Sequence, residues 1–242
     1  MIRAVIFDMD GLLVDSEPLA REAWQRAARL HGGEIASELF ARMLGRRQVE
    51  CAEVVRDALG LSIPADALCR QRNDLFMELL PGRVKPMPGA IELLRELERR
   101  AVPRALATSA EQRYVTAVLD QLQLDRAFAV RVVAEDVAHG KPLPDVYLLA
   151  AERLGVRPAD CLVLEDAPNG LAAARAAGMP SVAVPNACTR SLDLSAADAS
   201  LPSLVAVRGE LDALFARRWM HRSGCPPPCA DGVCAECQTL PE

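Results

Sequence analysis

Lysine is almost missing from this chain of 242 residues, because Lys85 and Lys141 are the only two among 28 basic residues. Histidine is nearly as rare, and His31, His139 and His221 match no arrangement of a nucleophile with a general base. No Gly-rich loop of the P-loop or dinucleotide-binding type is present. Nucleophilic and acid–base roles would therefore fall to carboxylates.

Long apolar runs and excess positive charge are missing as well. No apolar stretch approaches membrane-spanning length, and Asp8 and Asp10 interrupt the apolar stretch nearest the N-terminus, which argues against a secretory leader. The net charge of -5 gives no electrostatic footprint for nucleic acid, and no basic amphipathic helix suggests a membrane surface. With few aromatics, we expect a globular, cytoplasmic monomer without nucleic-acid or membrane partners.

The eight cysteines form two groups. Four are scattered through predicted elements and are interpreted as small core residues in a reducing compartment: Cys51, Cys69, Cys161 and Cys188. The other four crowd the C-terminal tail: Cys225, Cys229, Cys234 and Cys237. Their spacing could close a tetrahedral Zn²⁺ site, whereas three consecutive prolines and the lack of an apolar core favour a flexible tail. Both interpretations stay open.

Two carboxylates, Asp8 and Asp10, follow the first apolar run of the chain and precede Gly11. A short apolar run that ends at a turn is typical of a buried strand in a parallel sheet. Ligands of open α/β sheets bind beyond the carboxyl ends of the strands. Because neighbouring carboxylates repel, the pair favours a shared proton or a hard cation such as Mg²⁺, which often accompanies phosphate. The alternative is a strand followed by a polar turn.

The next part of the chain, from Ser16 to about Leu80, has helical character and no predicted strand. Ser16 before Glu17 and Pro18 is a helix-start signal. Four helices bounded by Gly or Pro are predicted, at 17–30, 35–44, 49–59 and 65–80. Four helices with no strand between them predict a small bundle.

Helices and strands then alternate. The predicted helices are 90–100, 111–122, 145–154 and 170–177, and the predicted strands are 104–108, 130–133, 161–165 and 181–184. Such alternation predicts βαβ units and a parallel sheet, to which the first strand also belongs. We therefore expect an α/β core of residues 1–15 and 86–218, a helical cap of residues 16–85, a tail of residues 219–242, and a cleft beside Asp10.

Polar residues end the predicted strands at equivalent places. Thr108 and Ser109 end the second strand, Lys141 follows the third, and Glu165 and Asp166 end the fourth. With Asp8 and Asp10, these carboxylates could hold one magnesium ion and leave a carboxylate for other work. The hydroxyls and the ammonium are donors for phosphate oxygens, and attack of an aspartate on phosphorus is an established covalent route.

Four short segments resemble the four motifs of the haloacid dehalogenase superfamily, in its phosphatase and phosphomutase branch with an inserted helical cap. The segments are 8–11 (DMDG), 106–108 (LAT), 140–142 (GKP) and 164–166 (LED). The resemblance extends over residues 2–215, and pseudouridine-5′-phosphatases and sugar-phosphate phosphatases look most similar. It implies a Rossmann-like, three-layer parallel sheet core with an all-α cap.

The resemblance also implies residue roles. Asp8 would be the nucleophile that forms an aspartyl-phosphate, and Asp10 would protonate the leaving oxygen and later activate water. Thr108 would hydrogen-bond the phosphoryl group and Lys141 would pair with Asp8 and the phosphate. The alternative for Thr108 is a helix cap.

The resemblance further implies a magnesium site. Its ligands would be Asp8, the backbone carbonyl of Asp10, and Asp166, with Glu165 in support. The alternative for Glu165 is a surface acid.

Three activities compete: a phosphatase acting on a small organic phosphate ester, a β-phosphoglucomutase-type isomerase, and a non-catalytic binding protein. The complete set of acids argues against the last. In the mutases a histidine and a cap arginine are usual where this chain has Ala20 and Gln48, so we favour the phosphatase. Arg46, Arg47 and Arg72 in the cap, with Ser109, are candidate substrate contacts; for each arginine a solvated helix face is the alternative.

Overall fold

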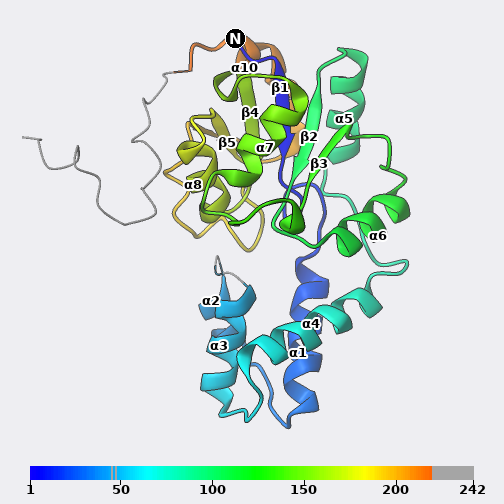
Figure 1. Cartoon of the computed structure of the whole chain (residues 1–242), viewed down its shortest axis with the longest axis vertical. Helices are drawn as coiled ribbons and strands as arrows, with labels where there is room; N and C mark the ends of the chain where they lie inside the picture. Colours follow the sequence, from blue (N-terminus) through cyan, green and yellow to red (C-terminus); the bar gives the residue numbers. More distant parts are fainter. Residues whose placement is uncertain (45, 47, 220–242) are drawn as a thin grey trace, which may run out of the picture.

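Six parallel strands form the central sheet of the computed structural model, in the order β3-β2-β1-β4-β5-β6 (Figure 1). The structure describes residues 1–44, 46 and 48–219. The strands are β1 (Ala4–Phe7), β2 (Arg104–Ala107), β3 (Val130–Val132), β4 (Cys161–Glu165), β5 (Ser181–Ala183) and β6 (Ala199–Ser200). The first strand of the chain therefore lies at the centre of the sheet, between β2 and β4.

Alternate side chains of the central strand enter two separate cores. Val5 and Phe7 pack in one cluster, and Ala4 and Ile6 pack in another on the opposite face, as the pleat of a strand requires. The helices of the first face are α5 (Ala90–Arg99), α6 (Gln112–Leu122), α9 (Leu204–Gly209) and α10 (Leu211–Ala216). Those of the second are α7 (Asp145–Leu154) and α8 (Pro168–Ala176). This confirms the predicted three-layer α/β fold.

Four of the five helices between β1 and β2 pack largely on one another. They are α1 (Glu17–Leu30), α2 (Ser37–Met43), α3 (Gln48–Leu59) and α4 (Ala65–Leu79). Trp24, Met43, Val55 and Leu68 lie in their shared core, which is separate from both clusters of the sheet. Figure 1 shows these helices on the side of the sheet where β1 ends. The limits of core, cap and tail remain predictions.

The two connections between the sheet and these helices run side by side. The amide of Asp15 donates to the carbonyl of Lys85 at 2.9 Å, and the amide of Met87 donates to the carbonyl of Leu13 at 2.9 Å. Between them, Val14 pairs with Pro86 in an antiparallel bridge. The entry and exit of the helical insertion are thus tied together by backbone hydrogen bonds.

The helix and strand boundaries depart from the predicted ones by one or two residues. Helix α8 begins earlier than predicted because Pro168, which suits the first helical turn, starts it. Strand β6 and helices α9 and α10 were not predicted, since so few residues carry no readable periodicity. Among the described helices, none has the length and apolar character needed to cross a membrane.

Two short 3₁₀ helices, η1 (Ala134–Asp136) and η2 (Pro158–Asp160), complete the described elements. η2 leads directly into β4, and η1 follows β3.

Candidate active site

The register of the sheet brings the ends of β1 and β4 level. Phe7 pairs with Leu164, and the amide of Asp8 donates to the carbonyl of Leu164 at 3.1 Å. Asp8 and Glu165, the next residues along, are therefore neighbours at the carboxyl edge. On the other side of β1, Phe7 pairs with Leu106 of β2, which ends just before Thr108.

Lys141 connects these two carboxylates. Its Nζ lies 2.5 Å from Asp8 Oδ1 and 2.7 Å from Glu165 Oε1, and its side chain is 7% exposed. Burial works to lower the pKa of Lys141, but the negative charges of Asp8 and Glu165 outweigh it and hold that pKa well above its ordinary value. The lysine is thus an ammonium ion shared between two acids.

Glu165 is held from several directions at once. Its Oε1 also accepts a hydrogen bond from the Tyr147 hydroxyl at 3.0 Å, and its Oε2 accepts the amides of Asp166 and Ala167, which precede α8. A Cβ on Gly170 would lie only 1.5 Å from Glu165 Oε1, so no side chain fits there. At 1% exposure Glu165 is not the surface acid considered as its alternative.

Three buried carboxylates form a group that could hold a metal ion: Asp8, Glu165 and Asp166 each offer one oxygen within 4.8 Å of the others. Burial, and then the charge of Glu165, raise the pKa of Asp8 to about 7 and that of Asp166 well above its ordinary range. The single positive charge of Lys141 therefore does not neutralise the three carboxylates. Hard oxygen donors with surplus negative charge fit Mg²⁺.

Asn186, which the sequence did not single out, positions Asp166. Its Nδ2 donates to Asp166 Oδ2 at 2.7 Å and to the carbonyl of Gly11 at 3.0 Å. Its own Oδ1 accepts the amides of Cys188 and Thr189, which fixes the orientation of the side-chain amide. Because Asn186 follows β5, the same carboxyl-edge rule that selected the other residues could have found it.

Gly11 lies where the backbone passes close to this pair. Its φ of +78° is a left-handed conformation that glycine adopts without strain, and a Cβ there would lie 2.6 Å from Asp166 Oδ2. Glycine after Asp10 is therefore required both by the turn and by the packing against Asp166.

Asp10 is half-buried and is hydrogen-bonded to Tyr114, a residue that no sequence motif singled out. The Tyr114 hydroxyl donates to Asp10 Oδ1 at 2.5 Å. Burial, and then the charge of Asp10, raise the pKa of Tyr114 well above its ordinary value, so the phenol stays protonated as a donor. Tyr114 belongs to the apolar face of α6 by its spacing, which is why no sequence signal set it apart.

The two predicted hydroxyl residues differ in environment. Thr108 is buried, and its Oγ1 accepts the amide of Ala110 at 3.1 Å, so it acts as a local cap while its hydroxyl proton is still available for donation. Ser109 is exposed, and its Oγ would lie 3.8 Å from a Cβ on Gly140. Ser109 thus faces the loop that carries Lys141.

The predicted cap cations also differ. Arg72 in α4 is 5% exposed, so its alternative as part of a solvated helix face is wrong. Its guanidinium lies over the rings of Phe76 and Trp24, at 4.4 and 5.7 Å from their centroids. Its Nη1 donates to Asn73 Oδ1 at 3.1 Å, whereas its Nε has no hydrogen-bond partner among the described residues. Burial lowers the pKa of Arg72, while the charge of Asp10 raises it.

Arg46 is exposed, and its Nε donates to the carbonyl of Arg42 at 2.8 Å. Arg47 lies outside the described residues, as do the four tail cysteines proposed for zinc, Cys225, Cys229, Cys234 and Cys237.

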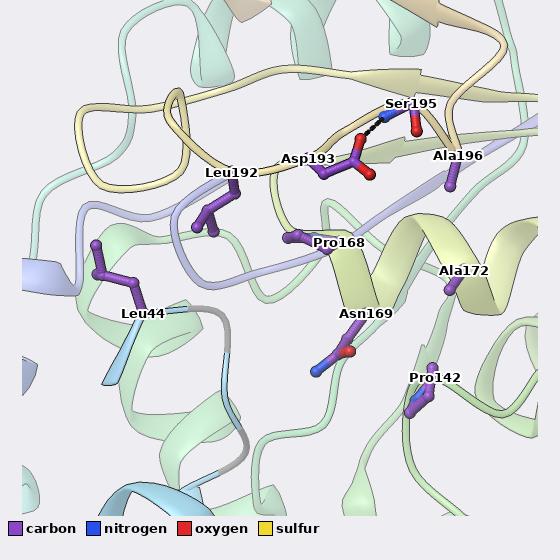
Figure 2. Close-up of a pocket in the computed structure, with 9 residues that line it drawn as sticks. All are labelled: Leu44, Pro142, Pro168, Asn169, Ala172, Leu192, Asp193, Ser195 and Ala196. Carbon is purple, nitrogen blue, oxygen red and sulfur yellow. Dashed lines mark hydrogen bonds between the residues drawn. The ribbon is translucent and has the colours of Figure 1, made fainter. Parts of the chain in front are cut away.

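A pocket of about 490 Å³ lies where the cap meets the core. Figure 2 shows Leu44 on the cap side, with Pro168 and Asn169 from the start of α8 and Leu192 on the core side. Pro142, which follows Lys141, also lines it. The four carboxylates of the candidate site, Asp8, Asp10, Glu165 and Asp166, are not among the residues that line this pocket, so the predicted cleft beside Asp10 stays a prediction.

The comparisons with known proteins agree on one family. Residues 2–178 match the model of the haloacid dehalogenase-like hydrolases. A Thermotoga maritima protein named a phosphorylated carbohydrates phosphatase is 36% identical over 181 residues, which cover 75% of this chain and 84% of that protein. A Drosophila melanogaster protein named a probable pseudouridine-5′-phosphatase is 37% identical over 187 residues, which cover 75% of this chain and 80% of the relative.

Among solved structures, CbbY from Rhodobacter sphaeroides, in complex with phosphate, superposes with a TM-score of 0.73 at 28% identity, over 86% of this chain and 96% of that one. The predicted family is therefore confirmed. The chain belongs to the haloacid dehalogenase-like hydrolases, within their capped phosphatase and β-phosphoglucomutase-like branch, and it is an enzyme of the phosphoric monoester hydrolase type.

Proposed function

We propose that this enzyme is a magnesium-dependent phosphatase that releases phosphate from a small sugar phosphate or nucleoside monophosphate through an aspartyl-phosphate on Asp8. The observation that carries the proposal is the hydrogen bond of 2.5 Å from Lys141 Nζ to Asp8 Oδ1. Two further buried acids, Glu165 and Asp166, lie beside it. A carboxylate so placed at a strand end, with an acid two residues later, has the parts of a covalent phosphoryl transfer.

In the first half of the reaction, an oxygen of Asp8 forms a bond to phosphorus and the bond from phosphorus to the ester oxygen breaks. The electron pair stays on the ester oxygen, and Asp10 gives it a proton, so an alcohol leaves. In the second half, a water oxygen attacks phosphorus and loses a proton to Asp10. The bond between phosphorus and Asp8 breaks, and inorganic phosphate is released.

Lys141 and Thr108 would hold the phosphoryl oxygens during both halves. The ammonium of Lys141 offsets charge on Asp8 before attack and on the phosphoryl group afterwards. The hydroxyl proton of Thr108 can be donated, because its oxygen already accepts the amide of Ala110. Glu165 and Tyr147 act through Lys141, since they fix the position of its side chain.

Asp8 and Asp166, with the backbone carbonyl of Asp10 and with Glu165 in support, would hold the magnesium ion. When bound, the ion supplies positive charge that offsets the buried acids and polarises the phosphoryl oxygens. Asn186 keeps Asp166 oriented for this purpose.

The substrate class rests on the relatives and on the cap. One relative is named a phosphorylated carbohydrates phosphatase and another a probable pseudouridine-5′-phosphatase. Arg72 adds a buried guanidinium whose Nε has no hydrogen-bond partner among the described residues, and the charge of Asp10 acts to raise its pKa. This guanidinium suits hydroxyl or anionic groups of a leaving group. Ser109 and Arg46 are further candidate contacts, and with them Arg47.

A mutase is the less favoured alternative. It would have to return the phosphoryl group to a second hydroxyl, and the sequence has Ala20 and Gln48 where such enzymes usually have histidine and arginine.

The test is a phosphate-release screen with magnesium over sugar phosphates and nucleoside monophosphates, with Asp8→Asn alongside. We expect release by the wild type and a loss of about 10⁴-fold or more in the variant. Exposed Asp212→Asn makes the same chemical change away from the site and should keep full activity. Turnover retained by Asp8→Asn refutes the nucleophile. Glucose 6-phosphate formed from β-glucose 1-phosphate without phosphate release identifies a mutase instead.

A further inference from the structure

Tyr114 lies between the candidate acid, Asp10, and helix α4 of the cap. It sits in the first turn of α6 and is 7% exposed. Its hydroxyl donates to Asp10 Oδ1 at 2.5 Å. Its ring packs edge-on against Phe76 of α4, with centroids 5.1 Å apart and planes at 64°.

The bond to Tyr114 gives the two oxygens of Asp10 different properties. An oxygen that accepts a phenol proton is the carbonyl-like one, so the transferable proton of the acid sits on the other oxygen. The bond also fixes the rotation of the carboxyl group, which a half-buried aspartate would otherwise sample freely. Proton transfer requires such positioning, because the acid must lie within hydrogen-bond reach of the ester oxygen.

Helix α4 contacts this turn of α6 in two further places. Asn73 Nδ2 donates to Glu111 Oε1 at 3.3 Å, and Arg113 Nη1 donates to Asp74 Oδ1 at 3.0 Å. With the contact between Phe76 and Tyr114, three neighbouring positions of the cap helix meet three neighbouring positions of the core. Docking of the cap therefore sets the place of Tyr114 and, through its hydroxyl, that of Asp10.

We infer that Tyr114 is a positioning residue for the general acid: it fixes the carboxyl group of Asp10 and ties its orientation to the docking of α4. The inference rests on the proposed function, since it assigns Tyr114 a part in the proton transfer from Asp10 to the leaving oxygen. Phe76 supports Tyr114 from the cap.

The test compares two leaving groups in Tyr114→Phe, which keeps the ring and its packing on Phe76. kcat/KM covers the steps up to the aspartyl-phosphate. With ribose 5-phosphate, whose alkoxide needs a proton to leave, we expect kcat/KM to fall about tenfold to a hundredfold. With p-nitrophenyl phosphate, whose leaving group needs little protonation, the fall should stay under about threefold. An equal fall for both substrates, or no fall, overturns the inference.

Tyr147→Phe is the matched control, because it removes the only other tyrosine hydroxyl of the chain, which faces Glu165 instead of Asp10. Tyr147→Phe should lower kcat/KM by the same factor for both substrates. If the wild type does not release phosphate from ribose 5-phosphate, the most active sugar phosphate of the screen takes its place. A wild type that releases no phosphate from any ester of the screen contradicts the proposed function itself, whereas an active wild type with a Tyr114→Phe variant that shows no selectivity contradicts only this inference.

Discussion

The two candidate catalytic aspartates lie two residues apart but are held in different ways. Asp8 is 7% exposed and is fixed by Lys141, which Glu165 and Tyr147 hold in turn, and all of these residues come from the core. Asp10 is half-buried, and its partner Tyr114 contacts a helix of the cap. The nucleophile is therefore preorganised by the core alone, whereas the acid depends on where the cap lies.

The largest effect on stability is expected on the core side, from Lys141→Met. This change leaves buried acids without their ammonium, so the free energy of unfolding at pH 7 should fall by about 3 kcal/mol in the absence of metal. Added magnesium should restore part of the loss. Denaturant unfolding with EDTA and then with magnesium measures both values.

Lys85→Met is the control, because it changes the only other lysine, which is exposed. It should leave the unfolding curve within experimental error of the wild type. If the two lysine variants unfold alike, the core side is not organised around Lys141.

A smaller effect of opposite sign is expected on the cap side, from Arg72→Met. The guanidinium is buried with an unpartnered Nε, so an apolar side chain of similar length should raise the free energy of unfolding by about 1 kcal/mol. KM for the best sugar phosphate should rise about tenfold, because a charged hydrogen bond to the substrate is lost. Thermal melts and steady-state kinetics test the two halves of this prediction.

Arg70→Met on the same helix, whose side chain is 69% exposed, is the matched control. Lower stability together with an unchanged KM would show that Arg72 serves the packing on Phe76 and Trp24 and not the substrate.

The smallest effect concerns Glu17, which lies where the first connection enters the cap. Burial, and then the charge of Asp10, raise the pKa of Glu17 above its ordinary value of 4.5. The folded state thus binds this proton more tightly than the unfolded state, so its contribution to stability is present at acid pH and is lost as pH rises through the folded pKa. The glutamine of Glu17→Gln cannot ionise, so the variant does not lose this stability as pH rises.

The melting temperature of Glu17→Gln should therefore match the wild type near pH 4 and exceed it by about 1–3 °C at pH 8. Melts across this pH range in EDTA measure the difference. A constant difference at every pH would show that the charge of Glu17 has no part in it.

The same contrast explains how far the sequence was predictive. Polar residues directly after apolar runs pointed to Asp8, Asp10, Glu165 and Asp166, because strand ends of a parallel sheet share one edge. No such signal exists for Tyr114: it occupies an ordinary apolar position of α6, and its partner is 104 residues away in the chain. Pairings of that kind become visible only once the helices are placed.

In the cap, too, some features could be predicted from the sequence and others only the structure shows. The four helices could be predicted from their periodicity, but the interpretation of Arg72 could not, because a charged residue on an amphipathic helix is usually solvated. Here the rings of Trp24 and Phe76 cover it.

Asn186 has a consequence for how the enzyme is made. The carbonyl of Gly11 and the amide of Asn186 that binds it are 175 residues apart, and β1 lies between strands that are synthesised long after it. At ribosomal rates of about 5–20 residues per second, the first loop waits on the order of 10 to 35 s for that partner. The catalytic edge is thus begun by β1 and completed only when Asn186 has been synthesised, 175 residues after Gly11, so a nascent chain short of Asn186 holds its acids without the finished site.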